Sequence, residues 1–120
     1  MIELLPEPAG KVVSLRASGE VSAEDYEQVV IPAVETALAQ HGKVRVLYQL
    51  SSEFTGFTAG AMWDDMKLGL GHFHQWDKVA VVTDVEWVAN AMRLFAFAMP
   101  CPVKVFGNAQ FDAAAQWIVD

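Results

Sequence analysis

Three short segments of mainly apolar and β-branched residues alternate with longer segments of helical periodicity, and this alternation constrains the fold most strongly. The strand-like segments are KVRVLYQL (43–50), KVAVVT (78–83) and PVKVF (102–106). Nearly continuous apolar composition is typical of strands that are buried on both faces of a parallel sheet. Strands separated by helices predict α/β units with right-handed crossovers, and therefore a largely parallel sheet.

The N-terminal part predicts two further strands that form a hairpin. IELLP (2–6) is short and apolar, and KVVSLRASG (11–19) alternates between apolar and polar residues. The stretch from Pro6 to Gly10 is rich in turn residues. We therefore expect an antiparallel pair whose second strand has one more polar face.

The first helix is predicted over SAEDYEQVVIPAVETALAQHG (22–42). Its apolar residues recur at spacings of three and four, which indicates one apolar helix face. Ser22 is a suitable N-cap, and Gly42 is a suitable C-terminal stop. Pro32 lies inside the pattern, so we expect a kink there because proline removes a helical hydrogen bond.

A loop over SSEFTGF (51–57) and a second helix over 59–76 are predicted next, with Thr58 as the N-cap. Glycine lowers helix stability by up to about 1 kcal/mol relative to alanine. Three glycines weaken this helix: Gly60, Gly69 and Gly71. The adjacent carboxylates of Asp64 and Asp65 are expected on its solvated face, with Asp65 at the border of the apolar side.

The third helix, expected over 84–99, has an unusually wide apolar surface. At about 100° per residue, Glu86, Asn90 and Arg93 form one narrow polar stripe, on which Phe97 also lies. One interpretation is that the broad face packs on the sheet, with Phe97 incidental or in a dimer contact. The other is that part of this Met- and Phe-rich face borders a cavity or meets a membrane.

With a short closing helix over 109–120, the predicted order is β-β-α-β-α-β-α-β-α. A chain of 120 residues, 53% of them hydrophobic, is long enough for one core and shows no linker. We therefore expect a single α/β domain over 1–120, in which a mostly parallel five-stranded sheet with an N-terminal antiparallel hairpin carries four helices.

The charge and the N-terminal sequence narrow the classes of function. With 15 acidic and 8 basic residues, the net charge of −7 disfavours nucleic acid and electrostatic docking on anionic lipid. It does not disfavour hydrophobic insertion, which depends on local apolar area. No apolar run approaches the ~20 residues of a membrane span. The acidic start has no signal-peptide pattern, so we expect a cytoplasmic protein.

No arrangement of residues predicts catalysis, a metal or a cofactor. The GLG sequence at 69–71 lies inside a helical pattern, so it is not a dinucleotide-binding fingerprint. His72 and His74 are two residues apart and would point in different directions on a helix. Cys101, the single cysteine, has apolar neighbours and no evident base, which favours a structural thiol. We therefore expect a protein that is not an enzyme.

Four stretches together resemble one known family. They are GKVRVLYQL, FTGFTAGAMWDDMKLGL, WDKVAVVTDVEWV and AAAQWI. They resemble the small bacterial SpoIIAA-like family, STAS-type domains described as related to CRAL-TRIO lipid-transfer domains, and the resemblance covers nearly the whole chain in the right order. It implies a βα superhelix with strands in sequential order and helices around the sheet.

The CRAL-TRIO side of the resemblance implies a lipophilic ligand between the sheet and a movable helix, with membrane contact during exchange. The leading hypothesis is therefore a non-enzymatic protein that binds a lipophilic small molecule and associates transiently with a membrane, placed in the cytoplasm or peripherally at the inner membrane. The candidate ligand-binding residues are large and apolar: Met62, Trp63, Met66, Leu70, Trp87, Met92, Phe95 and Phe97.

The STAS side of the resemblance implies an alternative function. Such domains bind protein partners, and anti-sigma-factor antagonists among them are switched by phosphorylation near the start of the helix after the third strand. Thr58 is the best phosphosite candidate here, although the Asp-Ser-Gly type motif is missing and YQL replaces an acidic strand ending. A homodimer is compatible with either hypothesis, because a second copy can bury a leftover apolar patch.

Overall fold

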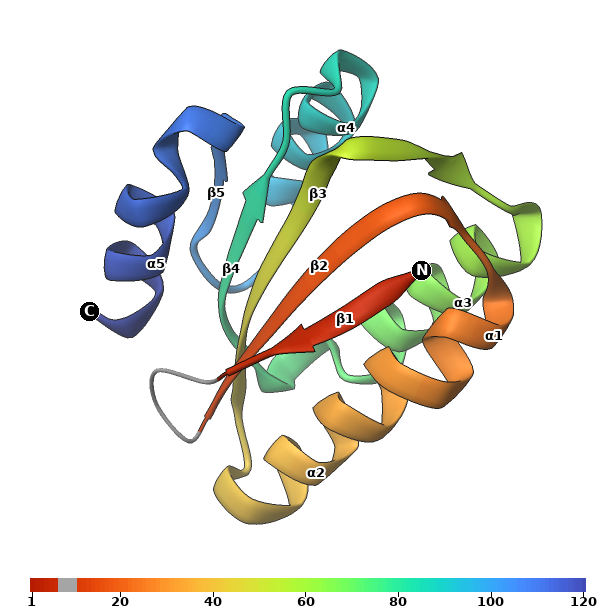
Figure 1. The fold of residues 1–120 in the computed structure, drawn as a ribbon. Coiled ribbons are helices and arrows are strands. Elements are labelled where there is room, and N and C mark those ends of the chain that lie inside the picture. The colour runs from red at the N-terminus through yellow and green to blue at the C-terminus, as the bar shows by residue number, and fades with distance from the viewer. Residues whose placement is uncertain (7–10) are drawn as a thin grey trace.

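The five strands form one sheet in the order in which they occur in the chain, β1-β2-β3-β4-β5. The computed structural model describes residues 1–6 and 11–120, so the turn expected from Pro6 to Gly10 lies mainly outside the described residues. The strands are β1 (Ile2–Leu5), β2 (Val12–Val21), β3 (Val44–Phe57), β4 (Trp76–Val82) and β5 (Val103–Phe106). Strands β1 and β2 are antiparallel and the other neighbours are parallel, which confirms the predicted fold class (Figure 1).

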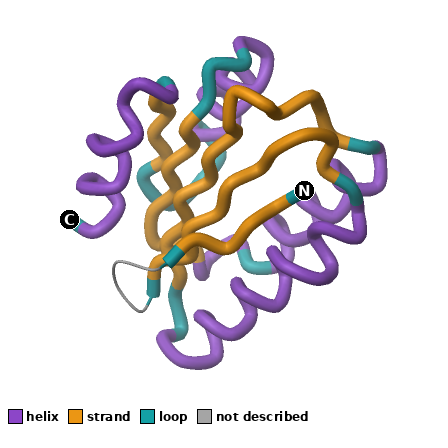
Figure 2. The backbone as a smooth tube through the Cα atoms, in the orientation of Figure 1, coloured by secondary structure: helices purple, strands orange, loops and turns teal. Residues whose placement is uncertain are grey.

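The helices lie on both sides of the sheet in unequal numbers (Figures 1 and 2). The continuous helical segment before β3 lies on one side of the sheet together with α3 and α4. Helix α5 lies alone on the other side. The helical elements are α1 (Ala23–Asp25), the π-helix η1 (Tyr26–Val30), α2 (Ile31–His41), α3 (Ala59–Gly71), the 3-10 turn η2 (Phe73–Gln75), α4 (Glu86–Ala96), the 3-10 turn η3 (Asn108–Gln110) and α5 (Phe111–Val119).

The first helical segment begins and ends as its sequence predicts, but its middle differs. The Ser22 side chain accepts a hydrogen bond from the Asp25 N–H, and the Asp25 carboxylate accepts one from the Ser22 N–H, which completes a capping box. Gly42 ends α2 in the left-handed conformation, with φ of 75°. The widened π-helical turn η1 precedes Pro32, which then lies at the start of α2 where a missing N–H costs little. The helix thus changes from π to α type beside Pro32.

Strand β3 is longer than predicted, and the expected loop over 51–57 was wrong. These residues continue the strand to Phe57 and pair with the end of β2, where Val21 lies opposite Phe57. The pairing contains register shifts, and Gly19 and Gly56 have φ of 62° and 152° there. Backbone pairing therefore extends the sheet through a glycine-containing segment that begins with three polar residues, Ser51 to Glu53.

Helix α3 is shorter than predicted, because it ends at Gly71 rather than running to residue 76. Thr58 is its N-cap, as predicted, and its hydroxyl accepts a hydrogen bond from the Ala61 N–H at 3.1 Å. After the turn η2, Trp76 begins β4, and its indole Nε1 donates to the Gly69 carbonyl at 3.0 Å. The tryptophan thereby ties the end of α3 to the start of the next strand.

Each face of the sheet has its own hydrophobic core. The α5 face is formed by Val12, Leu47, Ala80, Val82, Phe106, Ala114 and Ile118. The opposite face is larger and includes the predicted inward side of β2, namely Val13, Leu15 and Ala17, together with residues of the other helices. The alternating pattern of β2 is thus explained, since its two faces meet different layers.

Candidate ligand-binding cavity

A cavity of about 750 Å³ lies between the larger face of the sheet and helices α2, α3 and α4. This volume is within the range of about 300–1,000 Å³ that is typical of small-molecule sites. The wall is overwhelmingly apolar. The strands contribute Leu15, Val46, Tyr48, Leu50, Phe57, Trp76, Val79, Val81 and Val103.

The structure places seven of the eight candidate ligand-binding residues around this cavity. Helix α3 contributes Met62, Trp63, Met66 and Leu70, and helix α4 contributes Trp87, Met92 and Phe95. Phe97 does not line the cavity, because α4 ends at Ala96 and the Phe97 side chain is 91% exposed. Whether the seven residues contact a ligand stays a prediction.

The large side chains of α3 are exposed because the helix packs by its other face. Its buried residues are Ala61 and Asp64, which are small or polar. An added Cβ at Gly60 would lie 3.0 Å from the Ala23 Cβ, so this face approaches α1 closely. The apolar side chains opposite are each more than half exposed: Met62, Trp63, Met66 and Leu70. Contiguous exposed apolar side chains of this size mark interaction surfaces.

Asp64 does not lie on a solvated face, and that expectation was wrong. Its side chain is buried, and Oδ1 lies 3.5 Å from Lys67 Nζ. Within the described residues, its buried Oδ2 has no hydrogen-bond partner. A buried carboxylate oxygen without a partner lowers stability, so the contact between α3 and α1 is weaker than an apolar one would be.

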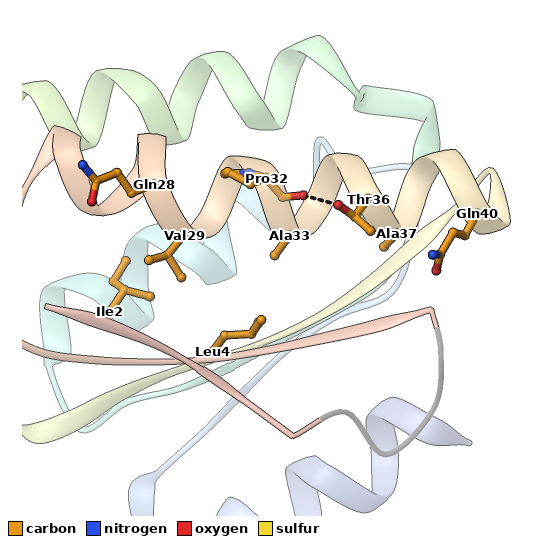
Figure 3. A pocket seen from close by; sticks show the side chains of 9 residues that line it. All are labelled: Ile2, Leu4, Gln28, Val29, Pro32, Ala33, Thr36, Ala37 and Gln40. Atoms are coloured by element: carbon orange, nitrogen blue, oxygen red, sulfur yellow. Dashed lines mark hydrogen bonds between the residues drawn. The ribbon is translucent and has the colours of Figure 1, made fainter.

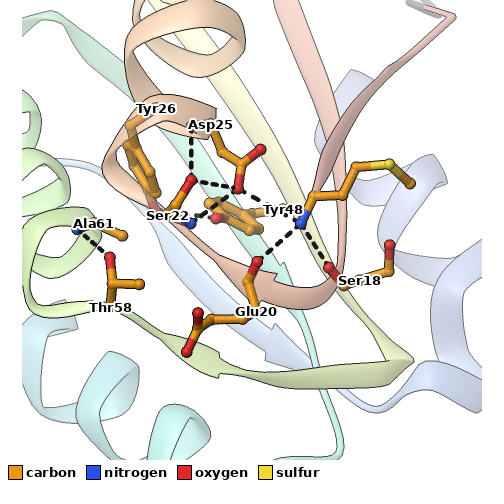
Figure 4. A network of polar contacts seen from close by, with 9 residues as sticks. Ser18, Glu20, Ser22, Asp25, Tyr26, Tyr48, Thr58 and Ala61 are labelled. Carbon is orange, nitrogen blue, oxygen red and sulfur yellow. Dashed lines mark hydrogen bonds and ion pairs between the residues drawn. The ribbon is translucent and has the colours of Figure 1, made fainter.

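A chain of hydrogen bonds lies in the otherwise apolar wall. The Tyr26 hydroxyl donates to Asp65 Oδ1 at 2.8 Å and lies 3.0 Å from the Tyr48 hydroxyl. All three residues line the cavity. Figure 4 shows Tyr26 and Tyr48 beside the capping network of Ser22 and Asp25 at the start of α1. The first helical segment, β3 and α3 therefore bring three polar groups together at one point.

The surroundings of this cluster shift the pKa of each group upward. Burial raises the pKa of the Asp65 carboxyl, and the hydrogen bond from Tyr26 partly offsets this effect. Asp65 is nevertheless an exposed residue on the cavity side, so water screens part of its charge. Burial, reinforced by the negative charge of Asp65, also raises the pKa of Tyr26 and Tyr48. Both tyrosines are therefore neutral hydroxyls at physiological pH.

The sequence contains a partial signal for this cluster. Asp65 was expected at the border of the apolar side of its helix, and there it lies. Tyr26 and Tyr48 were not among the candidate site residues, since each fits an apolar pattern, one on a helix face and one in a buried strand. A hydroxyl in an apolar pattern is the signal that could have found them, because buried tyrosine hydroxyls need a partner.

A second hollow, of about 540 Å³, lies between β1 and α2 (Figure 3). Its lining includes Leu4 from the edge strand and Gln28 and Gln40 from the helical segment. The Thr36 hydroxyl donates to the Pro32 carbonyl at 2.8 Å and is thereby occupied. The described residues of its lining include no titratable side chain, in contrast to the main cavity with Asp65.

Other candidate features remain outside the cavity. His72 Nδ1 lies 2.8 Å from Gln75 Oε1, and in the described part of the chain no three acidic, histidine or cysteine side chains form a metal-binding group. Burial raises the pKa of the half-buried Cys101 thiol, which lowers its reactivity. No helix among residues 1–6 and 11–120 is long and apolar enough to cross a bilayer.

A five-stranded sheet in sequential order, with three helical segments on one face and one helix on the other, defines a particular class of small α/β domain. The chain belongs to the SpoIIAA-like family, whose profile matches residues 12–119. A crystal structure of an uncharacterised protein of the DUF3478 family from Shewanella loihica PV-4, described as having a SpoIIAA-like fold, is similar with 31% identity and a TM-score of 0.75. The match covers 98% of this chain and 93% of the other. No curated protein matched the sequence.

Proposed function

We propose that this protein is a non-enzymatic binding protein for a lipophilic small molecule, held in the cavity between the sheet and helices α2 to α4. The observation that carries the proposal is the cavity of about 750 Å³ with an almost wholly apolar wall. Ligand sites of this kind combine an apolar wall with a few convergent polar groups, and Asp65, Tyr26 and Tyr48 supply those groups.

Helix α3 is the element that we expect to move when the ligand enters or leaves. It carries glycines at 60, 69 and 71, a buried carboxylate oxygen without a partner at Asp64, and large apolar side chains that are exposed. Each of these features lowers the free energy needed to displace the helix. The proposed relationship to CRAL-TRIO lipid-binding domains includes such a movable helix.

Exposed apolar residues of α3 and α4 support transient contact with a membrane. Trp63 and Trp87 are 60% and 52% exposed, and Leu94 of α4 is 74% exposed. Aromatic and aliphatic side chains of this kind enter the boundary between head groups and acyl chains, without attraction between charges. We therefore propose a cytoplasmic protein that docks peripherally at the inner membrane by hydrophobic contact, since its net charge of −7 opposes docking on anionic lipid.

Native mass spectrometry of gently purified protein, followed by organic extraction, tests the proposal. The expected result is a stoichiometric, lipid-like adduct that is lost in Ala91→Trp, because Ala91 lines the cavity and the indole would fill it. Ala113→Trp is the matched control, since Ala113 is an exposed residue of α5 on the other side of the sheet. The same spectrum counts the subunits and so tests for a homodimer.

Two results would contradict the proposal. One is a clean apo mass together with no binding of an added neutral apolar fluorophore. The other is equal retention of the adduct by Ala91→Trp and Ala113→Trp, which would place the bound molecule outside the cavity.

A second candidate function is a STAS-like regulatory module that binds a protein partner, and membership of the SpoIIAA-like family favours it. Thr58 is half-buried, and a phosphate on its hydroxyl would lie at the N-terminus of α3, where backbone N–H groups favour an anion. We expect a partner to be retained by Thr58→Ser and lost by Thr58→Glu. We also expect phosphate to be detected on Thr58 in the purified protein. Absence of phosphate and equal retention by both variants would count against this function.

A further inference from the structure

We propose that Asp65, Tyr26 and Tyr48 bind the polar end of the ligand, and that this end is a hydrogen-bond donor, with a protonated amine on an apolar chain as the best match. This inference rests on the proposed function, because it names the class of molecule that the cavity takes. The three residues come from helix α3, the π-helical turn η1 and strand β3, and they meet at one point of the cavity wall.

The direction of the hydrogen bonds decides what the cluster offers. Tyr26 has one hydroxyl proton and donates it to Asp65 Oδ1. The Tyr48 hydroxyl, 3.0 Å from that of Tyr26, must therefore donate to the Tyr26 oxygen. Both protons are then occupied, whereas the lone pairs of Tyr48 stay free. With Asp65 ionised, the cluster presents acceptors to the cavity.

The second oxygen of Asp65 is the main acceptor. Among the described residues, no donor lies within hydrogen-bond distance of Asp65 Oδ2. The side chain lines the cavity, so this oxygen is open to a ligand rather than sealed in the core. A carboxylate binds a charged donor more strongly than a neutral one, which favours an ammonium group over a hydroxyl group.

The charges around the cavity exclude an anionic ligand end. Among the described lining residues there is no lysine, arginine or histidine, and Asp65 carries the only carboxyl group. A carboxylate or phosphate in this cavity would be desolvated beside a like charge and would find no cation. A cationic ligand end would instead pair with the carboxylate of Asp65.

Three decyl compounds of equal chain length test the proposal: decylamine, 1-decanol and decanoate. Each is titrated below its micelle concentration against the protein loaded with the neutral fluorophore N-phenyl-1-naphthylamine, at neutral pH. We expect decylamine to bind at least about tenfold more tightly than decanoate, as a charge-assisted hydrogen bond implies, with 1-decanol between them.

A matched pair of variants assigns the preference to the cluster. Asp65→Asn is expected to weaken decylamine binding about tenfold or more and to leave 1-decanol within about threefold. Asp112→Asn is the control, because Asp112 is an exposed residue of α5 and its loss changes the net charge equally. If attraction of cations to the acidic protein were the cause, the two variants would weaken decylamine equally.

The outcomes separate this proposal from the one on which it rests. Decanoate binding as tightly as decylamine, or decylamine affinity that Asp65→Asn does not change, would overturn the assignment of a donor ligand and leave a lipophilic site in place. Failure of the fluorophore and of all three compounds to bind would overturn the cavity as a ligand site. If a variant folds poorly, the comparison of the three compounds on the unmodified protein can still overturn the assignment, because decanoate binding as tightly as decylamine contradicts it.

Discussion

The two faces of the sheet differ in how closely their helices pack. On one face, α5 buries Ala114 and Ile118 completely against the strands and leaves little space. On the other, α2, α3 and α4 together surround a cavity of about 750 Å³. More helices have thus produced looser packing, because the side chains that point toward the sheet decide the fit rather than the number of helices.

The last turns of α5 and α3 show the same difference. The α5 carbonyls of Trp117 and Ile118 accept hydrogen bonds from Lys78 Nζ at 2.7 Å and Arg45 Nη1 at 2.8 Å. Cations at a helix C-terminus stabilise it through the helix dipole. The corresponding end of α3 accepts a neutral donor, the Trp76 indole. One helix is therefore fixed at its end by charge and packing, whereas the other is held lightly.

Ile118→Ala gives the largest expected effect. Ile118 is 0% exposed in the α5 core, so truncation should lower the free energy of unfolding by about 2–5 kcal/mol. Met66→Ala on the cavity side should change it by only about 0.5 kcal/mol, because Met66 is 55% exposed. Urea denaturation measures both. Equal losses would show that the two faces are packed alike.

Asp77→Asn should lower stability by about 1.5–3 kcal/mol at neutral pH, because it removes a charge-assisted hydrogen bond. Asp77 Oδ2 lies 2.8 Å from Arg45 Nε and 3.1 Å from Lys11 Nζ. The hydrogen bond from Arg45 holds the pKa of Asp77 below its ordinary value of 3.8, and burial partly offsets this.

The sign of the pH dependence follows from the lowered pKa of Asp77. Its contribution is fully present above pH 3.8, the unfolded value, and is lost as pH falls through the folded pKa. The stability gap between the natural protein and Asp77→Asn should therefore narrow in acid. A gap that stays constant across urea titrations at several pH values would assign the effect to packing.

Asp65→Asn should have the opposite sign and raise stability slightly at neutral pH, because Asp65 is an exposed residue and solvent screens much of the cost of its charge. Burial raises the pKa of Asp65, so ionisation costs stability as pH rises through the folded value, and the cost is absent below the unfolded value of 3.8. Thermal unfolding across pH measures it. A loss of stability at neutral pH would mean that the charged form is stabilised.

Gly69→Ala should give a small gain in stability of about 0.5–1 kcal/mol, from lower chain entropy in the unfolded state. An added Cβ at Gly69 meets no atom within 4 Å, whereas one at Gly60 lies 3.0 Å from the Ala23 Cβ. Gly60→Ala should therefore lower stability and speed hydrogen exchange in α3. Equal exchange rates in α3 and α5 in the unmodified protein would remove the evidence for a movable helix.

The strand and helix order could be predicted because each element carries its own local pattern. The buried strands are nearly continuous in apolar residues, and caps such as Ser22 and Gly42 mark the helix ends. The extension of β3 through 51–57 could not be predicted, since its order comes from pairing with β2. The burial of Asp64 was missed for a related reason, because it depends on how closely α3 approaches α1.

The apolar part of the candidate site could be predicted, because it depends only on which helix faces carry large apolar side chains. Large apolar side chains on two wide helix faces indicated the cavity wall, and only Phe97 lies elsewhere, since α4 ends earlier than expected. The polar cluster was beyond a local pattern. Tyr26, Tyr48 and Asp65 lie on three different elements. Only the folded chain brings the Tyr26 hydroxyl to 3.0 Å from the Tyr48 hydroxyl and to 2.8 Å from Asp65 Oδ1.

The order of the strands also has a consequence for synthesis of the chain. Each strand pairs with the one made just before it, so the sheet can grow in step with the ribosome. Helix α5 is synthesised after all five strands. Until then no helix packs on the apolar side chains of Val12, Leu47, Ala80 and Val82. A nascent chain would therefore present this apolar stripe to chaperones until α5 docks.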